Sequence, residues 1–211
     1  MTMRFKYFVM IFAAIAIVAG CANEQPGNAK LEDGDWSNKL MSWSKMPEMA
    51  IDLNHDYTAA FHTSKGDFVI KLFADEAPLT VNNFVFLANE GYYNGTTFHR
   101  VVESYMIVGG DRESKGVRSP GYVIPDELNT GMKYEEGIIA MGNSGTPNSG
   151  GGQFFICTGP DAANLNKEPT YSIFGRVISG MDVVKAIAGA PVKDNVPVEP
   201  IVIESIVIHE L

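Results

Sequence analysis

The residues best suited to chemistry lie in two short segments of this chain. One is Phe-His-Arg-Val-Val at residues 98–102, which places the guanidinium of Arg100 among large apolar side chains. The other is Gln-Phe-Phe-Ile at residues 153–156, which sets the amide of Gln153 beside two aromatic rings. The sequence supplies no metal-ligand cluster, phosphate-binding loop or paired nucleophile and base to accompany them. Together they predict a pocket that holds an apolar ring and hydrogen-bonds its polar group, without breaking a covalent bond.

The elements that must position these residues are mostly strands. Alternation of apolar and polar residues begins at Tyr57 and resumes after a tight turn at 64–67. One amphipathic helix is expected from Pro78 to just before Gly91, and a shorter helix at about 181–188. Further strands are expected at 97–102, 105–108, 137–141, 153–157, 173–177 and 200–209. Many short strands with Gly-rich turns and just two helices indicate a closed β architecture.

Several motifs resemble those of the cyclophilin family, in the family's order and approximate spacing. They are Phe-His-Arg-Val-Val at 98–102, Gly-Gly-Asp at 109–111, Met-Gly-Asn at 141–143, Gly-Gln-Phe-Phe-Ile-Cys at 152–157 and Ile-Phe-Gly-Arg-Val at 173–177. The likeness covers residues 54–211. Cyclophilins are peptidyl-prolyl cis/trans isomerases, so the resemblance implies this activity, with no cofactor. It also implies a mainly β fold, a closed eight-stranded antiparallel β-barrel capped by two α-helices.

The resemblance implies roles for individual residues as well. Arg100 matches the catalytic arginine that binds the proline carbonyl and stabilises the lone pair of the twisted nitrogen; the alternative is an arginine in a surface salt bridge. Gln153 matches the glutamine that holds the substrate backbone, and Phe155 the floor of the proline pocket. Phe154 is expected to point the opposite way, into the core. The other substrate-binding positions implied are Tyr105, Met106, Gly142, Asn143, Leu165 and Tyr171.

The sequence departs from the family pattern in three places: Val108, the segment at 164–169, and Tyr171. Val108 stands where the family commonly has a glutamine that orients the arginine, and its loss can cost rate. The usual Leu-Asp-Gly turn reads Leu-Asn-Lys-Glu-Pro at 165–169, and Asn164 replaces the preceding tryptophan, which predicts weak cyclosporin binding. Tyr171 replaces the pocket histidine, and a phenol can still donate a hydrogen bond. The change at Tyr171 is expected to be tolerated, but Val108 and the altered loop leave open a second function, a low-activity module or scaffold that binds proline-containing segments with little turnover.

The N-terminus predicts export and a lipid anchor. Residues 1–20 read as a signal peptide, with Arg4 and Lys6 ahead of an apolar stretch too short to favour a membrane span. The stretch ends in Val-Ala-Gly-Cys at 18–21, which resembles a bacterial lipobox, although an ordinary signal peptide is the alternative. Diacylglycerol on Cys21, with a further acyl chain such as palmitate, would supply the two tails that durable anchoring needs. The mature protein is then expected on the outer side of a bacterial membrane, inner or outer being undetermined.

Residues 21–53 are expected to link this anchor to the isomerase domain at 54–211. The start of the link is polar and turn-prone, which suits a tether. Apolar residues then make it too hydrophobic for a simple linker, among them Trp36, Leu40, Met41, Trp43 and Met46. It either packs against the domain or docks on another protein, and packing is the simpler expectation.

Charge, cysteine content and histidine spacing limit the partners, disulfides and metal sites that can be expected. The chain has 16 basic and 25 acidic residues and a net charge of −9, and loss of Arg4 and Lys6 with the signal peptide would lower it by two, to −11. This argues against nucleic acid as a partner. Besides Cys21, Cys157 is the only cysteine, so we expect a core residue and no internal disulfide. The four histidines lack ligand spacing, so no metal site is expected.

The expected partners are proline-containing polypeptide clients and a membrane, and the protein is expected to be monomeric.

Overall fold

The structure is a computed structural model that describes residues 41–112 and 120–211. The predicted signal peptide, Cys21 and the first part of the link therefore lie outside the described residues. Within the described ranges, no helix combines the length and the apolar character needed to traverse a lipid bilayer.

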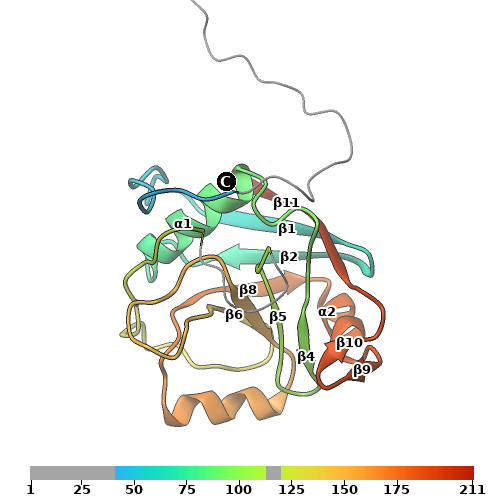
Figure 1. The fold of residues 1–211 in the computed structure, drawn as a ribbon. Coiled ribbons are helices and arrows are strands. Elements are labelled where there is room, and N and C mark those ends of the chain that lie inside the picture. The colour runs from blue at the N-terminus through green and yellow to red at the C-terminus, as the bar shows by residue number, and fades with distance from the viewer. Residues whose placement is uncertain (1–40, 113–119) are drawn as a thin grey trace, which may run out of the picture. The chain divides into compact units, whose positions relative to one another are not determined.

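Nine of the described strands form one curled antiparallel sheet (Figure 1). Its order is β3-β11-β1-β2-β8-β6-β7-β5-β4, and β9 pairs with β10 in a separate hairpin. The strands are β1 (Tyr57–Thr63), β2 (Gly66–Leu72), β3 (Thr96–Thr97), β4 (Arg100–Val102), β5 (Met106–Gly109), β6 (Ile138–Met141), β7 (Phe154–Cys157), β8 (Ile173–Ser179), β9 (Val192–Lys193), β10 (Val196–Pro197) and β11 (Val202–Glu210). The mainly β, antiparallel prediction is confirmed.

The closed eight-stranded barrel is not confirmed, because the sheet is a half-barrel that is open between β3 and β4. The strand predicted over 97–102 is broken in two at Phe98 and His99. The Phe98 N–H donates to the Ile201 carbonyl (2.9 Å), whereas the Val101 N–H donates to the Asn195 carbonyl between β9 and β10 (2.8 Å). These amides are thus used by the residue before β11 and by the turn between β9 and β10, and β3 and β4 are opposite ends of the sheet.

Both predicted helices are present, α1 (Pro78–Asn89) and α2 (Met181–Ala188), and α1 packs along β11 while α2 packs against β2 (Figure 1). The start of α1 is capped from far along the chain. The Glu127 carboxylate accepts the N–H groups of Leu79 (3.0 Å) and Thr80 (2.8 Å), donors that an α-helix leaves unpaired. A third, 3₁₀ helix that sequence patterns missed, η1 (Pro160–Lys167), lies between β7 and β8.

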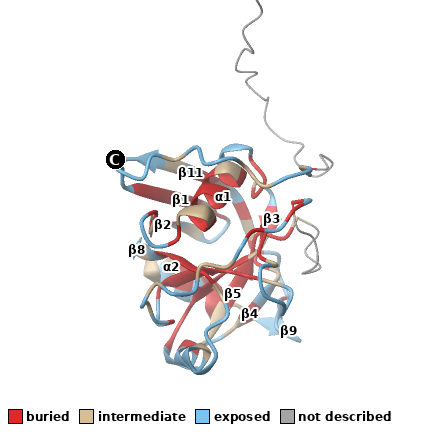
Figure 2. Cartoon of the chain, turned by 90° about the vertical axis from the view of Figure 1, so that its left-hand side faces the viewer, coloured by how far each residue is buried: buried red, intermediate tan, exposed pale blue. Residues whose placement is uncertain are grey.

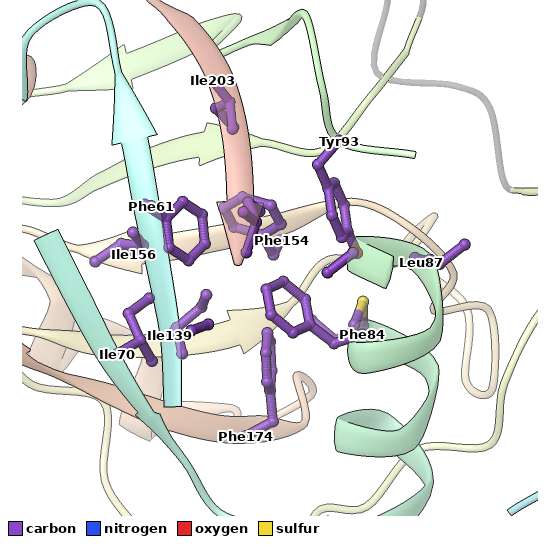
Figure 3. Close-up of a cluster of buried hydrophobic side chains, with 14 of the residues drawn as sticks. Phe61, Ile70, Phe84, Leu87, Tyr93, Ile139, Phe154, Ile156, Phe174 and Ile203 are labelled. Carbon is purple, nitrogen blue, oxygen red and sulfur yellow. The ribbon is translucent and has the colours of Figure 1, made fainter. Parts of the chain in front are cut away.

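Aromatic rings fill the main core inside the curled sheet (Figures 2 and 3). Phe154 is fully buried and meets Phe61, Phe84 and Tyr93 edge-to-face, with ring centroids 5.5–6.0 Å apart. Phe155, the next residue along β7, belongs to a separate cluster on the other face of the sheet. The predicted opposite orientation of the two phenylalanines is therefore confirmed.

Cys157 is the core residue that was predicted. It lies in the same cluster as Phe155, and none of its surface is exposed to solvent. Burial raises the pKa of its thiol to about 12, so the side chain stays protonated and unreactive at physiological pH.

The segment at 41–53 packs against α1, the first of the two alternatives for the link. The Trp43 ring meets Phe86 edge-on (centroids 5.1 Å apart), and the Trp43 N–H donates to the Pro120 carbonyl (2.8 Å). Asn82, a buried residue of α1, clamps the segment with both ends of its amide. Its Oδ1 accepts the N–H groups of Ala50 (2.8 Å) and Ile51 (3.3 Å), and its Nδ2 donates to the carbonyl of residue 48 (3.0 Å).

Asn82→Ala should lower the free energy of unfolding by about 1–3 kcal/mol, because three backbone groups lose their partner in a partly buried site. Urea unfolding measures the effect. Asn89→Ala is the matched control, since Asn89 is exposed on the same helix. A loss no larger than that of the control would contradict the clamp.

Candidate active site

A pocket of about 550 Å³ opens on the outer face of the sheet, where β4, β5 and β7 meet the loop after β6 and the β9–β10 hairpin. We call it the Arg100 pocket. The residues that line it are His99, Arg100, Tyr105, Met106, Val108, Gly142, Asn143, Gln153, Phe155, Tyr171 and Val196. The structure thus brings together all the predicted site residues except Leu165 and the lipidation residue Cys21, which lies outside the described ranges.

Leu165 lies in η1 and does not line the Arg100 pocket. Its partly buried side chain packs instead against the cluster that contains Phe155 and Tyr134. The altered sequence at 165–169 falls at the end of this helix, where the Asn166 side chain is tied to the backbone of Tyr134 by two hydrogen bonds of 2.9 Å. Leu165 therefore packs against the same cluster as the pocket floor residue Phe155.

Sheet register places Arg100 over the pocket. Arg100 on β4 is opposite Val108 on β5, and Val108 is opposite Phe155 on β7. The Arg100 side chain is exposed at the mouth of the pocket, and it forms no hydrogen bond or ion pair with another residue of the described ranges. The guanidinium is therefore available to a ligand, and the surface salt bridge considered above is absent from this part of the chain.

Three aromatic side chains form the apolar part of the pocket. Phe155 is 3% exposed and forms the floor, and the Tyr171 ring meets it edge-on with centroids 5.1 Å apart. Tyr171 is held through its backbone, because the Tyr134 hydroxyl donates to its carbonyl (2.6 Å) and accepts its N–H (3.0 Å). Partial burial raises the pKa of Tyr105, so its phenol stays neutral. The arrangement suits a small apolar ring.

The loop between β6 and β7 supplies polar groups. The Gly142 N–H donates to the Gln153 carbonyl (2.7 Å), which joins the two ends of the loop. The Asn143 side chain is used internally: its Nδ2 donates to the Thr170 carbonyl (2.9 Å) and its Oδ1 accepts the Gly145 N–H (3.0 Å). Its main-chain N–H and C=O have no partner among the described residues, so they are open to a peptide.

Sequence reasoning missed two residues of the pocket, His99 and Val196. Val196 belongs to the β9–β10 hairpin, whose turn residues Asp194 and Asn195 have positive φ of 53° and 65°. Asp and Asn tolerate this conformation, and such a pair between strand-forming residues is a hairpin signal. The Val101–Asn195 hydrogen bond then brings the hairpin to β4 and Val196 to the pocket rim.

The described residues contain no group of three or more His, Cys, Asp or Glu side chains able to hold a metal ion. The pocket has the apolar lining, the open backbone groups and the one cation at its mouth that suit an apolar ring on an extended backbone.

Comparisons with known proteins identify the family. A model of the cyclophilin type peptidyl-prolyl cis-trans isomerase/CLD family matches residues 58–208. Peptidyl-prolyl cis-trans isomerase B of Escherichia coli is 40% identical over 164 residues, covering 71% of this chain and 98% of that protein. Peptidyl-prolyl cis-trans isomerase A of Mycobacterium tuberculosis is 39% identical over 170 residues, 72% of this chain and 91% of that protein.

Solved structures agree. A crystal structure of a cyclophilin type peptidyl-prolyl cis-trans isomerase of Cryptosporidium parvum has 32% sequence identity and a TM-score of 0.68, and the match covers 73% of this chain and 98% of that one. A structure of the same protein in the presence of the dipeptide Ala-Pro has a TM-score of 0.67 at 33% identity, covering 72% of this chain and 98% of that one. The chain therefore belongs to the cyclophilin-type peptidyl-prolyl cis/trans isomerases, and its enzyme class is that of the family.

Proposed function

We propose that this protein isomerises X–Pro bonds of exported polypeptides, with Arg100 as the catalytic residue. The observation that carries the proposal is the meeting of Arg100, Gln153 and Phe155 in one pocket. Rotation about the X–Pro bond faces a barrier of about 18–20 kcal/mol and takes tens of seconds or more unaided. A catalyst of this step has to bind the twisted amide better than the planar one.

Each part of the pocket has a distinct task in this mechanism. Twisting breaks the amide resonance and leaves a lone pair on the proline nitrogen, which the Arg100 guanidinium stabilises by donating a hydrogen bond. Phe155 and its aromatic neighbours hold the proline ring, while the Gln153 amide and the main chain of Asn143 hold the peptide backbone. Arg100 is exposed at the pocket mouth, so the bound peptide itself excludes water and strengthens the interaction. No proton is transferred.

A protease-coupled assay on a proline-containing peptide tests the activity. We expect isomerisation well above the spontaneous rate. The second candidate, a proline-peptide-binding module or scaffold with little turnover, rests on Val108, which lines the pocket without a hydrogen-bonding group, and on the altered sequence at 165–169. Binding of the peptide without acceleration would favour that candidate.

Proposed partners follow from the same pocket. Proline-containing segments of unfolded exported proteins fit a site with one ring pocket and open backbone groups. Cyclosporin is expected to bind weakly, because Asn164 is exposed on η1 and spends its amide on the Asp161 carbonyl (3.0 Å) and the Lys167 ammonium (3.0 Å). We propose a monomer anchored to the outer side of a bacterial membrane through lipid on Cys21.

The anchor predicts a difference between the two cysteine variants. The wild-type chain expressed in a bacterial host should partition with membranes, whereas Cys21→Ser should appear in the soluble fraction, because the two-tailed anchor cannot be attached. Cys157→Ser is the matched control and should stay with the membranes. Equal partitioning of Cys21→Ser and wild type would contradict the lipid anchor.

A further inference from the structure

One side chain of the Arg100 pocket holds the amide of Gln153. The Gln153 Nε2 lies 3.3 Å from the Nε2 of His99, and both residues line the pocket. This is the only side-chain hydrogen bond of Gln153 within the described ranges. The Gln153 carbonyl is independently fixed by the Gly142 N–H, so the His99 contact decides only how the side-chain amide is turned.

The two facing nitrogens favour one position for the imidazole proton. With the Gln153 amide oriented this way, its nitrogen can only donate, so the Nε2 of His99 is assigned as the unprotonated acceptor and the ring proton is assigned to Nδ1. The Nδ1 atom is buried and has no partner of good hydrogen-bond geometry. The backbone of Thr97 nevertheless raises the pKa of His99, which favours a proton on the ring. In this state the amide oxygen of Gln153 is left facing the pocket, as an acceptor for a peptide N–H.

Nothing else in the pocket constrains this amide. Val108, opposite Arg100 on the sheet, has no polar side-chain group to offer either Arg100 or Gln153. Position 142 is a glycine, and a Cβ there would lie 3.1 Å from the Gln153 Cγ, closer than an ordinary contact. The glycine at 142 leaves the Gln153 side chain room to turn, so the orientation of its amide depends on the contact with His99.

We propose that His99 is a positioning residue that sets which end of the Gln153 amide, the oxygen or the NH₂ group, meets the bound peptide. Protonation of His99 reverses this orientation of the amide. A protonated ring donates from Nε2 and captures the amide oxygen, so the NH₂ group of Gln153 turns toward the pocket. A backbone N–H of the peptide then meets a donor instead of an acceptor. This inference rests on the proposed function of Gln153 in holding the peptide.

The electrostatic surroundings of His99 lower its pKa, so the ring becomes protonated only at acidic pH. Burial lowers the pKa of His99 from its ordinary value of 6.5, and the neighbouring Arg100 on β4 lowers it further. The buried Asp111, just beyond β5, and the Thr97 backbone act in the opposite direction, and the net shift is downward. The other titratable groups of the pocket are the phenols of Tyr105 and Tyr171. His99 is therefore neutral at pH 7, and at this pH the Gln153 amide oxygen faces the pocket as the acceptor for a peptide N–H.

The proton position can be measured without any substrate. Nitrogen-15 NMR of the imidazole in the free, full-length protein at pH 7.5 should show His99 protonated on Nδ1 and bare on Nε2, with a titration midpoint below 6.5. A ring that carries its proton on Nε2 at that pH would overturn the inference, because it could not accept from the Gln153 amide.

The effect on catalysis is read from pH profiles. A protease-free NMR exchange assay should show kcat/KM falling, as the pH drops through the His99 midpoint, to a lower plateau about tenfold below the neutral value, because one hydrogen bond to the peptide is lost. In His99→Gln the rate is lower at neutral pH, but the fall of kcat/KM at acidic pH (the acid limb of the profile) is lost, because the new amide does not titrate. His62→Gln is the matched control, since His62 is paired with Asp67 on the exposed side of β1 and should keep the wild-type profile.

The possible results of these experiments distinguish a failure of the proposed role of His99 from a failure of the proposed isomerase activity. An acid limb that persists in His99→Gln would overturn the role of His99 while leaving the isomerase proposal standing. A wild-type protein that isomerises no faster than the spontaneous rate at any pH would overturn the proposed function, and the NMR measurement would still decide whether His99 holds the Gln153 amide.

Discussion

Arg100→Ala should lower kcat/KM for X–Pro isomerisation by about 10²–10³-fold, the usual cost of removing one preorganised donor to a transition state, or about 2.7–4 kcal/mol. The guanidinium is the one group of the described pocket that is permanently cationic and free of protein partners. Its hydrogen bond to the proline nitrogen exists only when the amide is twisted, so the loss should appear mainly in kcat. Stopped-flow protease-coupled or NMR exchange assays measure it.

Arg176→Ala is the matched control for this substitution. Arg176 is also an exposed arginine on a strand, but it lies on β8 and pairs with Glu135. Its replacement should leave kcat/KM unchanged. The unfolding free energy of Arg100→Ala should also stay close to that of wild type, because the side chain is exposed and unpaired in the described structure. A loss of activity below about threefold, less than 0.7 kcal/mol, would refute the assigned role.

Arg100→Lys distinguishes charge from geometry. A lysine keeps the positive charge but loses the planar fork that can contact the carbonyl and the nitrogen together. Its activity should fall between wild type and Arg100→Ala. Activity equal to wild type would show that a point charge suffices.

The parts of the fold that the sequence predicted are those with strong local signals. The first helix follows from its apolar period and from Pro78 and Gly91 at its ends, and the structure places it at Pro78–Asn89. The alternation along β7 placed Phe154 and Phe155 on opposite faces. In both cases residues within one element determine the outcome, so the pattern can be read without knowledge of the fold.

The parts that were missed depend on contacts between distant segments. The break at Phe98 and His99 arises because the Ile201 and Asn195 carbonyls take amides that a continuous strand would have paired. The 3₁₀ helix η1 buries only Ala162, so it has almost no apolar period to read. Among the predicted site residues, Leu165 packs against the cluster of Phe155 without lining the Arg100 pocket, and its role in substrate binding stays a prediction.

The His99–Gln153 contact was missed for the same reason. The two side chains come from opposite ends of a chain segment of more than fifty residues, and they meet only because β4 and β7 both flank β5. The motif places each residue in the pocket, but it carries no information on which atoms of the amide and the imidazole face each other. That information came from the three-dimensional arrangement alone.

Phe154→Ala should lower the free energy of unfolding by about 3–5 kcal/mol, a large part of the 5–15 kcal/mol that a typical domain has. The Phe154 ring is fully buried and touches Phe61, Phe84 and Tyr93, so its removal leaves a cavity among rings that pack edge-to-face (Figure 3). Urea unfolding measures the loss. Since the side chain points away from the Arg100 pocket, kcat/KM of the folded variant should stay close to wild type.

Phe155→Ala is the comparison one residue along the same strand. Phe155 is also nearly buried, so this variant loses stability too, but its ring forms the pocket floor. Loss of the apolar contact with the proline ring, worth about 1.5–3 kcal/mol, should lower kcat/KM by about 10- to 100-fold. Both variants are to be assayed at a temperature where unfolding curves show them folded. If Phe154→Ala impaired the folded enzyme as much as Phe155→Ala, the division of β7 into a core face and a catalytic face would be wrong.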